Sequence, residues 1–260
     1  MKKFALIFSV MLVSSVLIAC QAKEQIVVVT ATPEPTTTPE PTAIPSPTLT
    51  PTPEPTPTPL GQIFHDDFNQ TLQPGWMWLN ENSKNWGIIE QGWLRIKSED
   101  LCLLNEHFQN NLLMLSAPVE GNFEIVTLVD ANTTGNFQQA SIYIFEDEGN
   151  YFSINRGYCD LCPTKGNGIF SDYMYKNKWP SFNGRSIDTD KVYLRIVVNR
   201  DKKEMITYYA VEPDKWIQLR KVPLVIAINQ VGLGSSNCDQ GENSENLVTL
   251  FDYFEISALD

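Results

Sequence analysis

The side chains most able to do chemistry are few in this chain, and their spacing gives little support to catalysis. The densest acidic run, residues 146–148, is followed directly by Gly149 and Asn150, which is typical of a solvated turn rather than of a catalytic carboxylate pair. The two histidines, His65 and His107, have no serine elbow of the G-x-S-x-G type near them. A hydrolytic triad therefore has little support, and we expect that the chain is not an enzyme.

Four aromatic side chains form a second group of candidates. They are Tyr173, Tyr175, Trp179 and Phe182. All lie in residues 157–182, a stretch containing glycine, asparagine and lysine that we expect to be a loop on a rigid scaffold. Sugars stack on exposed rings because their axial C–H faces are apolar, so these residues are candidate ligand-binding residues. The alternative is that the rings only cover one end of the core.

The N-terminal residues 1–20 have the layout of an export signal. Lys2 and Lys3 precede an apolar run over residues 4–18, which is short for a transmembrane span. The run ends in Leu-Ile-Ala-Cys, which resembles the lipobox of bacterial lipoproteins and implies that Cys20 carries the lipid. The alternatives are an ordinary signal peptide and an uncleaved anchor.

Residues 21–60 are predicted to be a disordered stalk. From residue 32 onward proline alternates with threonine, serine and glutamate. Proline fixes φ and removes hydrogen-bond donors, so this stretch favours polyproline II. At ~3.1 Å per residue it reaches on the order of 90 Å. The stalk would hold a folded domain, residues 61–260, clear of the membrane.

Export also bears on the remaining cysteines, which are Cys102, Cys159, Cys162 and Cys238. An even number of cysteines in an exported domain favours disulfides, with three pairings possible. Cys102–Cys159 or Cys102–Cys238 would join distant strands. A zinc site with four thiolates is the alternative, but the second close cysteine pair typical of such sites is missing.

Composition restricts the class of partner. A formal net charge of −12 argues against nucleic acid and against an electrostatic membrane patch, because both are bound mainly through lysine and arginine. Neutral sugars remain compatible. The membrane would then be reached through the lipid alone.

The region after residue 60 reads as a succession of strands. Residues 140–145 and 151–155 alternate apolar side chains on either side of a Gly-Asn turn, which predicts a hairpin. Because both faces of the first run are apolar, we expect a central strand covered on both sides. Residues 85–90 with 92–97, and 191–199 with 204–211, follow the same pattern. The sequence therefore predicts an all-β fold of two packed antiparallel sheets.

The order of the strand motifs carries a family resemblance. In chain order they are FHDDF, PGWMW, NWGIIEQGWLRI, NFEIVTLV, FQQASIYIFEDEGNYFSINR, VYLRIVV, ITYYAVEPDKWIQL, VGLGSS and FDYFEI. This succession resembles the concanavalin A-like sandwich at the C-terminus of family 43 β-xylosidases, also found as stand-alone modules of unassigned function. The resemblance covers residues 62–257 and implies a jelly roll whose first and last strands are neighbours.

The same resemblance bears on catalysis. Family 43 hydrolysis resides in a separate five-bladed propeller, and about 200 residues cannot hold both domains. Laminarinase-like enzymes of this fold type place carboxylates at E-x-D-x-x-E on one strand, a pattern missing from this sequence.

A structural calcium ion is a further expectation from the resemblance. If the first and last strands pair, then Asp66, Asp67 and Asp252 lie close together, and carboxylate oxygens suit calcium. The alternative is three separate, solvated aspartates.

These observations lead to one functional hypothesis and its rivals. We expect an exported lipoprotein, anchored to the bacterial cell membrane or outer membrane, whose sandwich binds a polysaccharide or glycan without hydrolysing it. Xylan is the ligand suggested by the resemblance. The rivals are a structural or protein-interaction module of the cell envelope, and an accessory or catalytic domain of a glycoside hydrolase.

Overall fold

The computed structural model describes residues 61–90, 92–99, 109–238 and 245–260. For Trp179 and Pro180 it describes the backbone only. The signal segment with Cys20, the Pro/Thr stretch, Cys102 and His107 lie outside the described residues, so the predictions made for them stay predictions.

All regular elements in the described residues are β-strands. They are β1 (Gln62–Asp66), β2 (Met77–Leu79), β3 (Trp86–Ile89), β4 (Trp93–Lys97), β5 (Leu112–Ser116), β6 (Asn122–Ala131), β7 (Gln138–Asp147), β8 (Asn150–Cys159), β9 (Gly166–Tyr175), β10 (Lys178–Ser186), β11 (Lys191–Asn199), β12 (Glu204–Ala210), β13 (Ile217–Pro223), β14 (Gln230–Asn237) and β15 (Val248–Leu259). The predicted all-β class is confirmed.

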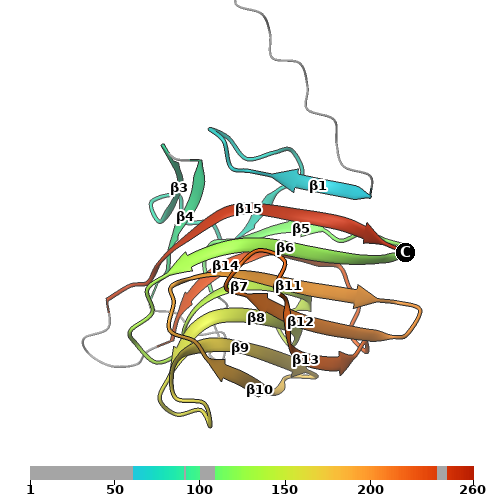
Figure 1. The fold of residues 1–260 in the computed structure, drawn as a ribbon. Coiled ribbons are helices and arrows are strands. Elements are labelled where there is room, and N and C mark those ends of the chain that lie inside the picture. Colours follow the sequence, from blue (N-terminus) through green and yellow to red (C-terminus); the bar gives the residue numbers. More distant parts are fainter. Residues whose placement is uncertain (1–60, 91, 100–108, 239–244) are drawn as a thin grey trace, which may run out of the picture. The chain divides into compact units, whose positions relative to one another are not determined.

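Two antiparallel sheets form the sandwich (Figure 1). An eight-stranded sheet runs in the order β13-β12-β11-β6-β15-β4-β3, with β1 also paired to β15. A seven-stranded sheet runs in the order β10-β9-β8-β7-β14-β5-β2. The first and last described strands are neighbours, as the family resemblance implies.

The core lies between the inner faces of the sheets. It contains Ile142 and Ile144 of β7, Ile196 of β11 and Phe251 and Phe254 of β15, all fully buried. Burying a side chain of this size contributes about 1.5–3 kcal/mol. Trp76, Trp78 and Trp86 are partly buried and pack against this cluster.

The hairpin of β7 and β8 is confirmed, with Ile142 opposite Ile154 and Tyr143 opposite Ser153. The outer face of β7 is apolar as predicted. Tyr143 and Phe145 belong to a second buried cluster, which also contains Leu112 of β5. A central strand covered on both sides therefore follows from the alternation of apolar residues on both faces.

The expectation of a loop over residues 157–182 is wrong. β8 extends to Cys159, and β9 and β10 form a further hairpin that turns at Lys176 and Asn177. The error has a physical reason. Ser171 and Asp172 are polar yet buried in the middle of β9, so they hide the alternation that identifies a strand.

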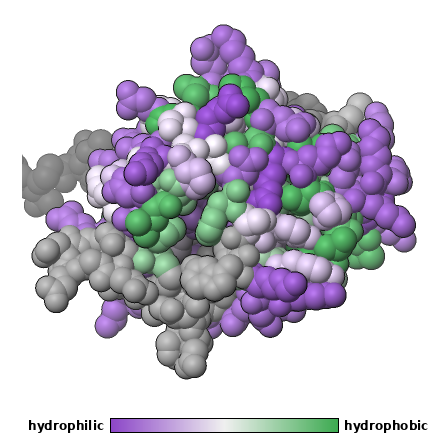
Figure 2. All heavy atoms as spheres, turned by 90° about the horizontal axis from the view of Figure 1, so that it is seen from below, coloured by the Kyte–Doolittle hydropathy of each residue, from purple (hydrophilic) through white to green (hydrophobic). Residues whose placement is uncertain are grey.

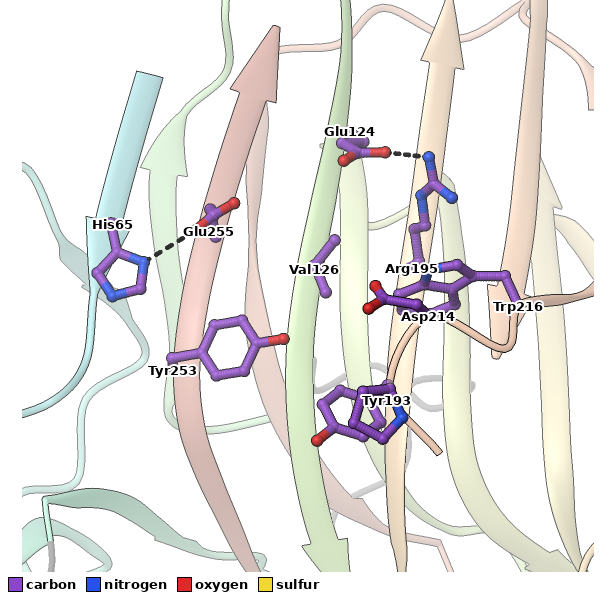
Figure 3. Close-up of a pocket in the computed structure, with 10 residues that line it drawn as sticks. His65, Glu124, Val126, Tyr193, Arg195, Asp214, Trp216, Tyr253 and Glu255 are labelled. Carbon is purple, nitrogen blue, oxygen red and sulfur yellow. Dashed lines mark hydrogen bonds and ion pairs between the residues drawn. The ribbon is translucent and has the colours of Figure 1, made fainter. Parts of the chain in front are cut away.

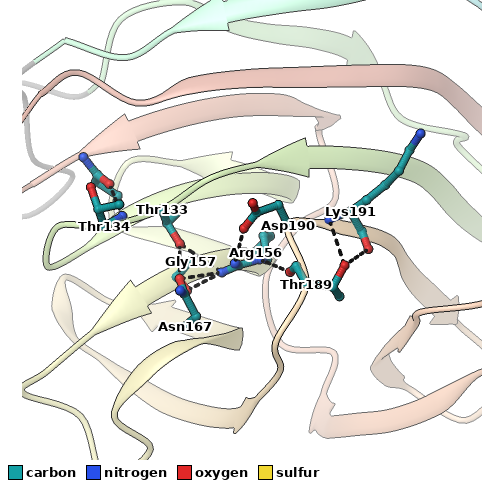
Figure 4. A network of polar contacts seen from close by, with 9 residues as sticks. Thr133, Thr134, Arg156, Gly157, Asn167, Thr189, Asp190 and Lys191 are labelled. Atoms are coloured by element: carbon teal, nitrogen blue, oxygen red, sulfur yellow. Dashed lines mark hydrogen bonds and ion pairs between the residues drawn. The ribbon is translucent and has the colours of Figure 1, made fainter.

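One end of the sandwich is held by a buried arginine (Figure 4). The side chain of Arg156 in β8 is inaccessible to solvent and donates from all three nitrogens. Its acceptors are Thr189 O, Thr133 Oγ1, Gly157 O, Asn167 Oδ1 and Asp190 Oδ1, at 2.8–3.2 Å. Thr133 and Asp190 lie on connections between the two sheets, so the network ties both sheets together.

The face of the molecule on the side of β10 is mixed in hydropathy. Figure 2 views the molecule from the side of β10, and outside its grey part hydrophobic atoms lie in patches separated by hydrophilic ones. Within the described ranges there is no helix long and apolar enough to cross a membrane.

Candidate functional site

A groove of about 550 Å³ lies on the outer face of the eight-stranded sheet (Figure 3). Three aromatic rings line it, those of Tyr193, Trp216 and Tyr253. Five ionisable side chains line it as well, namely His65, Glu124, Arg195, Asp214 and Glu255. We call it the aromatic groove.

Strand β11 places two of these residues by simple alternation. Val192, Leu194 and Ile196 are fully buried against the core. Successive side chains of a strand point to opposite faces, so Tyr193 and Arg195 project outward into the groove.

Arg195 is held from several sides. Its guanidinium forms an ion pair with Glu124 of the neighbouring strand β6. It also lies 5.3 Å from the ring centroid of Tyr208 and 5.4 Å from that of Trp216. Cation–π contacts of this kind contribute about 0.5–1 kcal/mol at exposed sites. The arginine thereby fixes the position of the indole.

Trp216 comes from the turn before β13. Asp214 within this turn has a φ of 60°, a left-handed conformation that aspartate adopts more readily than most residues. The ring of Trp216 then meets that of Tyr193 edge to face, with centroids 6.4 Å apart and planes at 78°. The two rings form one wall of the groove.

A β-bulge places the third ring. Phe251 and Phe254 of β15 both point into the core, and two residues, Asp252 and Tyr253, stand between them where regular alternation allows one. The carbonyl oxygen of Tyr253 accepts a hydrogen bond of 2.5 Å from Thr127 Oγ1 of β6. The bulge turns Tyr253 into the groove.

The opposite wall is built where β1 and β15 pair. His65 lies opposite Glu255, and its Nδ1 is 3.1 Å from Glu255 Oε2. Ser257 Oγ donates to the other carboxylate oxygen at 3.0 Å. The imidazole also stacks on the Tyr253 ring, at 6.0 Å between centroids.

Electrostatics keep Tyr253 a neutral hydrogen-bond donor. Burial raises the pKa of its phenol, and the nearby Tyr193, Glu255, Asp252 and Asp214 raise it further. A phenol in this setting stays protonated at all physiological pH values.

The arrangement suits binding. Here Glu124 and Glu255 each pair with a basic side chain. Flat rings beside these paired side chains offer stacking surfaces and hydrogen-bonding groups to a polar, uncharged ligand.

The aromatic residues selected from the sequence do not form one surface. Tyr173 and Tyr175 stack on each other, with centroids 6.4 Å apart, and pack against the core between the sheets. Phe182 lies on the outer face of the seven-stranded sheet and is 43% exposed. Trp179 belongs to β10 by its backbone, and its side chain is outside the described residues.

The three aspartates do not fit a calcium ion. Asp66 is buried, and its carboxylate accepts hydrogen bonds of 2.8 Å from the backbone nitrogens of Phe68 and Gln73 and from Trp76 Nε1. These donors occupy both carboxylate oxygens. The described residues contain no group of three or more His, Cys, Asp or Glu side chains able to hold a metal ion.

The other two aspartates are neighbours. Burial raises the pKa of Asp252, and the charge of Asp67 raises it further against the opposing effect of Lys191. Asp67 itself accepts hydrogen bonds from the backbone and side chain of Asn69. The pair is part of the turn after β1 and of the bulge in β15.

Cys159 and Cys162 form a disulfide with each other, with Cα atoms 5.6 Å apart. The turn after β8 brings them within disulfide range, so the Cys102–Cys159 pairing is wrong and these two sulfurs are not zinc ligands. Cys238 is also disulfide-bonded. The Cys102–Cys238 alternative involves a residue outside the described part of the chain.

Sequence reasoning missed the groove residues Tyr193, Arg195, Trp216 and Tyr253. A signal existed in β11, where Tyr193 and Arg195 alternate with aliphatic residues and so mark the outer face. The bulge at Tyr253 and the turn at Trp216 leave no periodic signal.

Comparison with known proteins agrees with this fold. A family model described as the β-xylosidase C-terminal concanavalin A-like domain matches residues 65–256. No match was found among curated proteins.

Solved structures with a similar fold include enzymes and a protein without known function. A GH43 protein, BlXynB, from Bacillus licheniformis has a TM-score of 0.63 and 19% identity, covering 75% of this chain and 39% of that chain. A xylan β-1,4-xylosidase from Bacillus halodurans has a TM-score of 0.61 and 16% identity, covering 74% and 38%. A functionally unknown protein from Saccharomyces cerevisiae has a TM-score of 0.55 and 15% identity, covering 72% and 97%.

This chain therefore spans about two fifths of the length of the two bacterial proteins, 39% and 38%. The family match covers most of the folded part, and the chain belongs to the family of β-xylosidase C-terminal concanavalin A-like domains.

Proposed function

We propose that this protein binds a carbohydrate without hydrolysing it and that the aromatic groove is the binding site. One observation carries the proposal. Tyr193, Trp216 and Tyr253, which come from three separate segments, line a single groove together with the Arg195–Glu124 ion pair and the His65–Glu255 contact. The rings offer flat apolar faces to the C–H groups of a sugar, and the charged groups can exchange hydrogen bonds with its hydroxyls.

Family membership supports a glycan as the ligand. The family is described from β-xylosidases, and one structural neighbour is a xylan β-1,4-xylosidase. Those activities belong to the longer proteins. For this chain they favour xylan-type oligosaccharides as the first ligands to test.

We also propose that Cys20 carries a lipid and that residues 21–60 separate the sandwich from the membrane. Metabolic labelling with a palmitate analogue in a bacterial host should label the protein and should not label Cys20→Ser. Equal labelling of both would contradict the anchor.

The binding site is tested by affinity electrophoresis of the full chain in gels that contain xylan, β-glucan or mannan. Migration should slow in at least one polysaccharide. Trp216→Ala should weaken that retardation on the order of tenfold, because a buried aromatic at the centre of an interface commonly carries more than 1 kcal/mol of binding.

Trp93→Ala is the matched control. Trp93 is half-buried on the same sheet, where its ring contacts Lys191 Nζ at 4.7 Å, and it does not line the groove. This variant should keep its retardation. Equal losses in the two variants, or none in Trp216→Ala, would contradict the site.

A further inference from the structure

The outer face of the seven-stranded sheet carries a second set of polar side chains. Cross-strand pairing places Tyr143, Ser153, Asp172 and Phe182 in one row across β7, β8, β9 and β10. In the adjacent row, Ser141 lies opposite Asn155. These residues alternate with the core residues of the same strands, so they face away from the core.

Four polar atoms on this side of the sheet are buried and have no hydrogen-bond partner among the described residues. They are Gln109 Nε2, Ser153 Oγ, Asn155 Oδ1 and Asp172 Oδ1. Their residues are at most 3% exposed. Gln109 joins the group through its contacts, because its Oε1 accepts a hydrogen bond from Tyr143 Oη at 3.4 Å. We call this set the polar cluster.

Such a concentration needs an explanation. Most buried polar atoms in native proteins are hydrogen-bonded, and each one left without a partner costs about 1–3 kcal/mol. Four atoms of this kind lie together on one face of one sheet.

The carboxylate of Asp172 is firmly oriented within the cluster. Its Oδ2 accepts hydrogen bonds from Asn155 Nδ2 at 2.7 Å and from Gln139 Nε2 at 3.1 Å. Burial raises the pKa of Asp172 to about 6 against the opposing effects of these bonds and of Arg220. Its Oδ1 accepts no hydrogen bond within the described residues.

The row that contains Asp172 ends at an open hollow. A cavity of about 230 Å³ is lined by Phe170, Phe182 and Gly184 and by the turn 162–164. Phe170 is the cross-strand partner of Asn155, and Phe182 that of Asp172, so the hollow adjoins the polar cluster. Phe182 is 43% exposed and offers its ring to solvent.

Glycine is required at the floor of this hollow. A Cβ on Gly184 would lie 2.6 Å from Phe170 Cδ1. The Cys159–Cys162 disulfide constrains the turn that forms the wall. Both features hold the hollow in shape beside the cluster.

We propose that the polar cluster and this hollow form a second binding site, which takes one sugar unit of a neutral oligosaccharide. The sugar ring lies on Phe182, and its hydroxyls pair with Asp172, Asn155 and Ser153 once the side chains that cover these buried atoms move aside. The vacant atoms include acceptors, a hydroxyl and an amide donor, a mixture that matches hydroxyl groups, which both donate and accept. A cation would leave the Gln109 amide without a partner.

This site lies on the opposite sheet from the aromatic groove and does not depend on it. The test is fluorine NMR of the full chain labelled with fluorophenylalanine, titrated with xylotetraose and with cellotetraose. The Phe182 resonance is identified by its loss in Phe182→Leu. One of the two sugars should shift it saturably, in the wild type and in Trp216→Ala alike.

Two variants of the polar cluster decide the outcome. Asp172→Asn keeps the shape of the side chain, and Ser153→Ala removes a hydroxyl without breaking any hydrogen bond within the described residues. Each should weaken the titration of the Phe182 resonance at least fivefold. Ser153→Ala should do so with an unchanged melting temperature, which a purely structural role would not produce.

A Phe182 resonance that neither sugar moves would overturn the second site and leave buried water as the occupant of the cluster. A shift that is equal in the wild type and both variants would overturn it as well. A shift that persists in Trp216→Ala while that variant still binds polysaccharide fully would support the second site and contradict the aromatic groove.

Discussion

Asn155 and Arg156 are consecutive residues of β8, and both side chains are fully buried, on opposite faces of the strand. Arg156 donates to five acceptors at the end of the sandwich (Figure 4). Asn155 Oδ1, on the outer face, has no partner in the described part of the chain. One buried polar group is fully satisfied and the other is not.

The difference between Arg156 and Asn155 shows two roles that buried polar groups can have in this fold. The Arg156 network joins connections between the two sheets, and its bonds offset the cost of burying the charge. The buried atoms of the polar cluster around Asp172 lack hydrogen-bond partners among the described residues, so their burial lowers the free energy of unfolding. Such a loss of stability is typical of binding sites. Measurements of stability can therefore distinguish the Arg156 network from the polar cluster.

The largest effect should come from Arg156→Met. Removing the guanidinium leaves Thr189 O and Gly157 O without that donor inside the sandwich, and we expect the free energy of unfolding to fall by about 3–5 kcal/mol. Urea denaturation measures this. Arg185→Met, at an exposed position of β10, should stay within about 0.5 kcal/mol of the wild type. Similar losses in both variants would show that the Arg156 network stabilises the fold no more than an exposed arginine does.

The second effect is a dependence on pH. Burial raises the pKa of Asp172 to about 6. Between about pH 4 and 6, the folded state therefore keeps a proton on this carboxyl group that the unfolded chain has already released. The protonated Asp172 carboxyl therefore makes its full contribution to the free energy of unfolding below pH 4, and this contribution is lost as the pH rises through 6. Arg220 opposes the shift, and the phenols of Tyr143 and Tyr151 face the same carboxylate.

Asp172→Asn removes this titration. At pH 8 the variant should be more stable than the wild type by on the order of 3 kcal/mol, and the two should converge near pH 4. Thermal unfolding across this range measures the difference. A variant that is less stable than the wild type at pH 8 would show that the carboxylate contributes to the fold as an ion.

The smallest effect comes from two buried serines that neighbour each other across β8 and β9. Ser171 Oγ donates to Ser153 O at 2.9 Å, whereas Ser153 Oγ has no partner among the residues described. Ser171→Ala should lose about 1 kcal/mol of stability, and Ser153→Ala should lose nothing measurable. If Ser153→Ala were the more destabilising of the two, its hydroxyl would have a partner within the protein.

The sequence predicted most of the sandwich because most strands alternate cleanly. Residues 140–145 carry aliphatic side chains to one face and aromatic ones to the other, and the structure follows that pattern. Strand β9 was missed because Ser171 and Asp172 are buried without being apolar. Of these two residues, Asp172 belongs to the proposed second site and Ser171 is its neighbour in the chain.

The aromatic groove could not be predicted in the same way. Tyr193, Trp216 and Tyr253 lie far apart in the chain, and only the pairing of β6 with β11 and β15 brings them together. A bulge changes the face to which every later residue of a strand points. Periodicity alone therefore could not assign Tyr253 to the groove.

Isothermal titration of the full chain with xylotetraose and cellotetraose tests whether this sandwich binds a carbohydrate. Heat of binding should be saturable for at least one sugar and should be reduced in Trp216→Ala but not in Trp93→Ala. Absence of any binding heat with both sugars and with polymeric xylan, from a chain shown to be folded, would contradict carbohydrate binding by this domain.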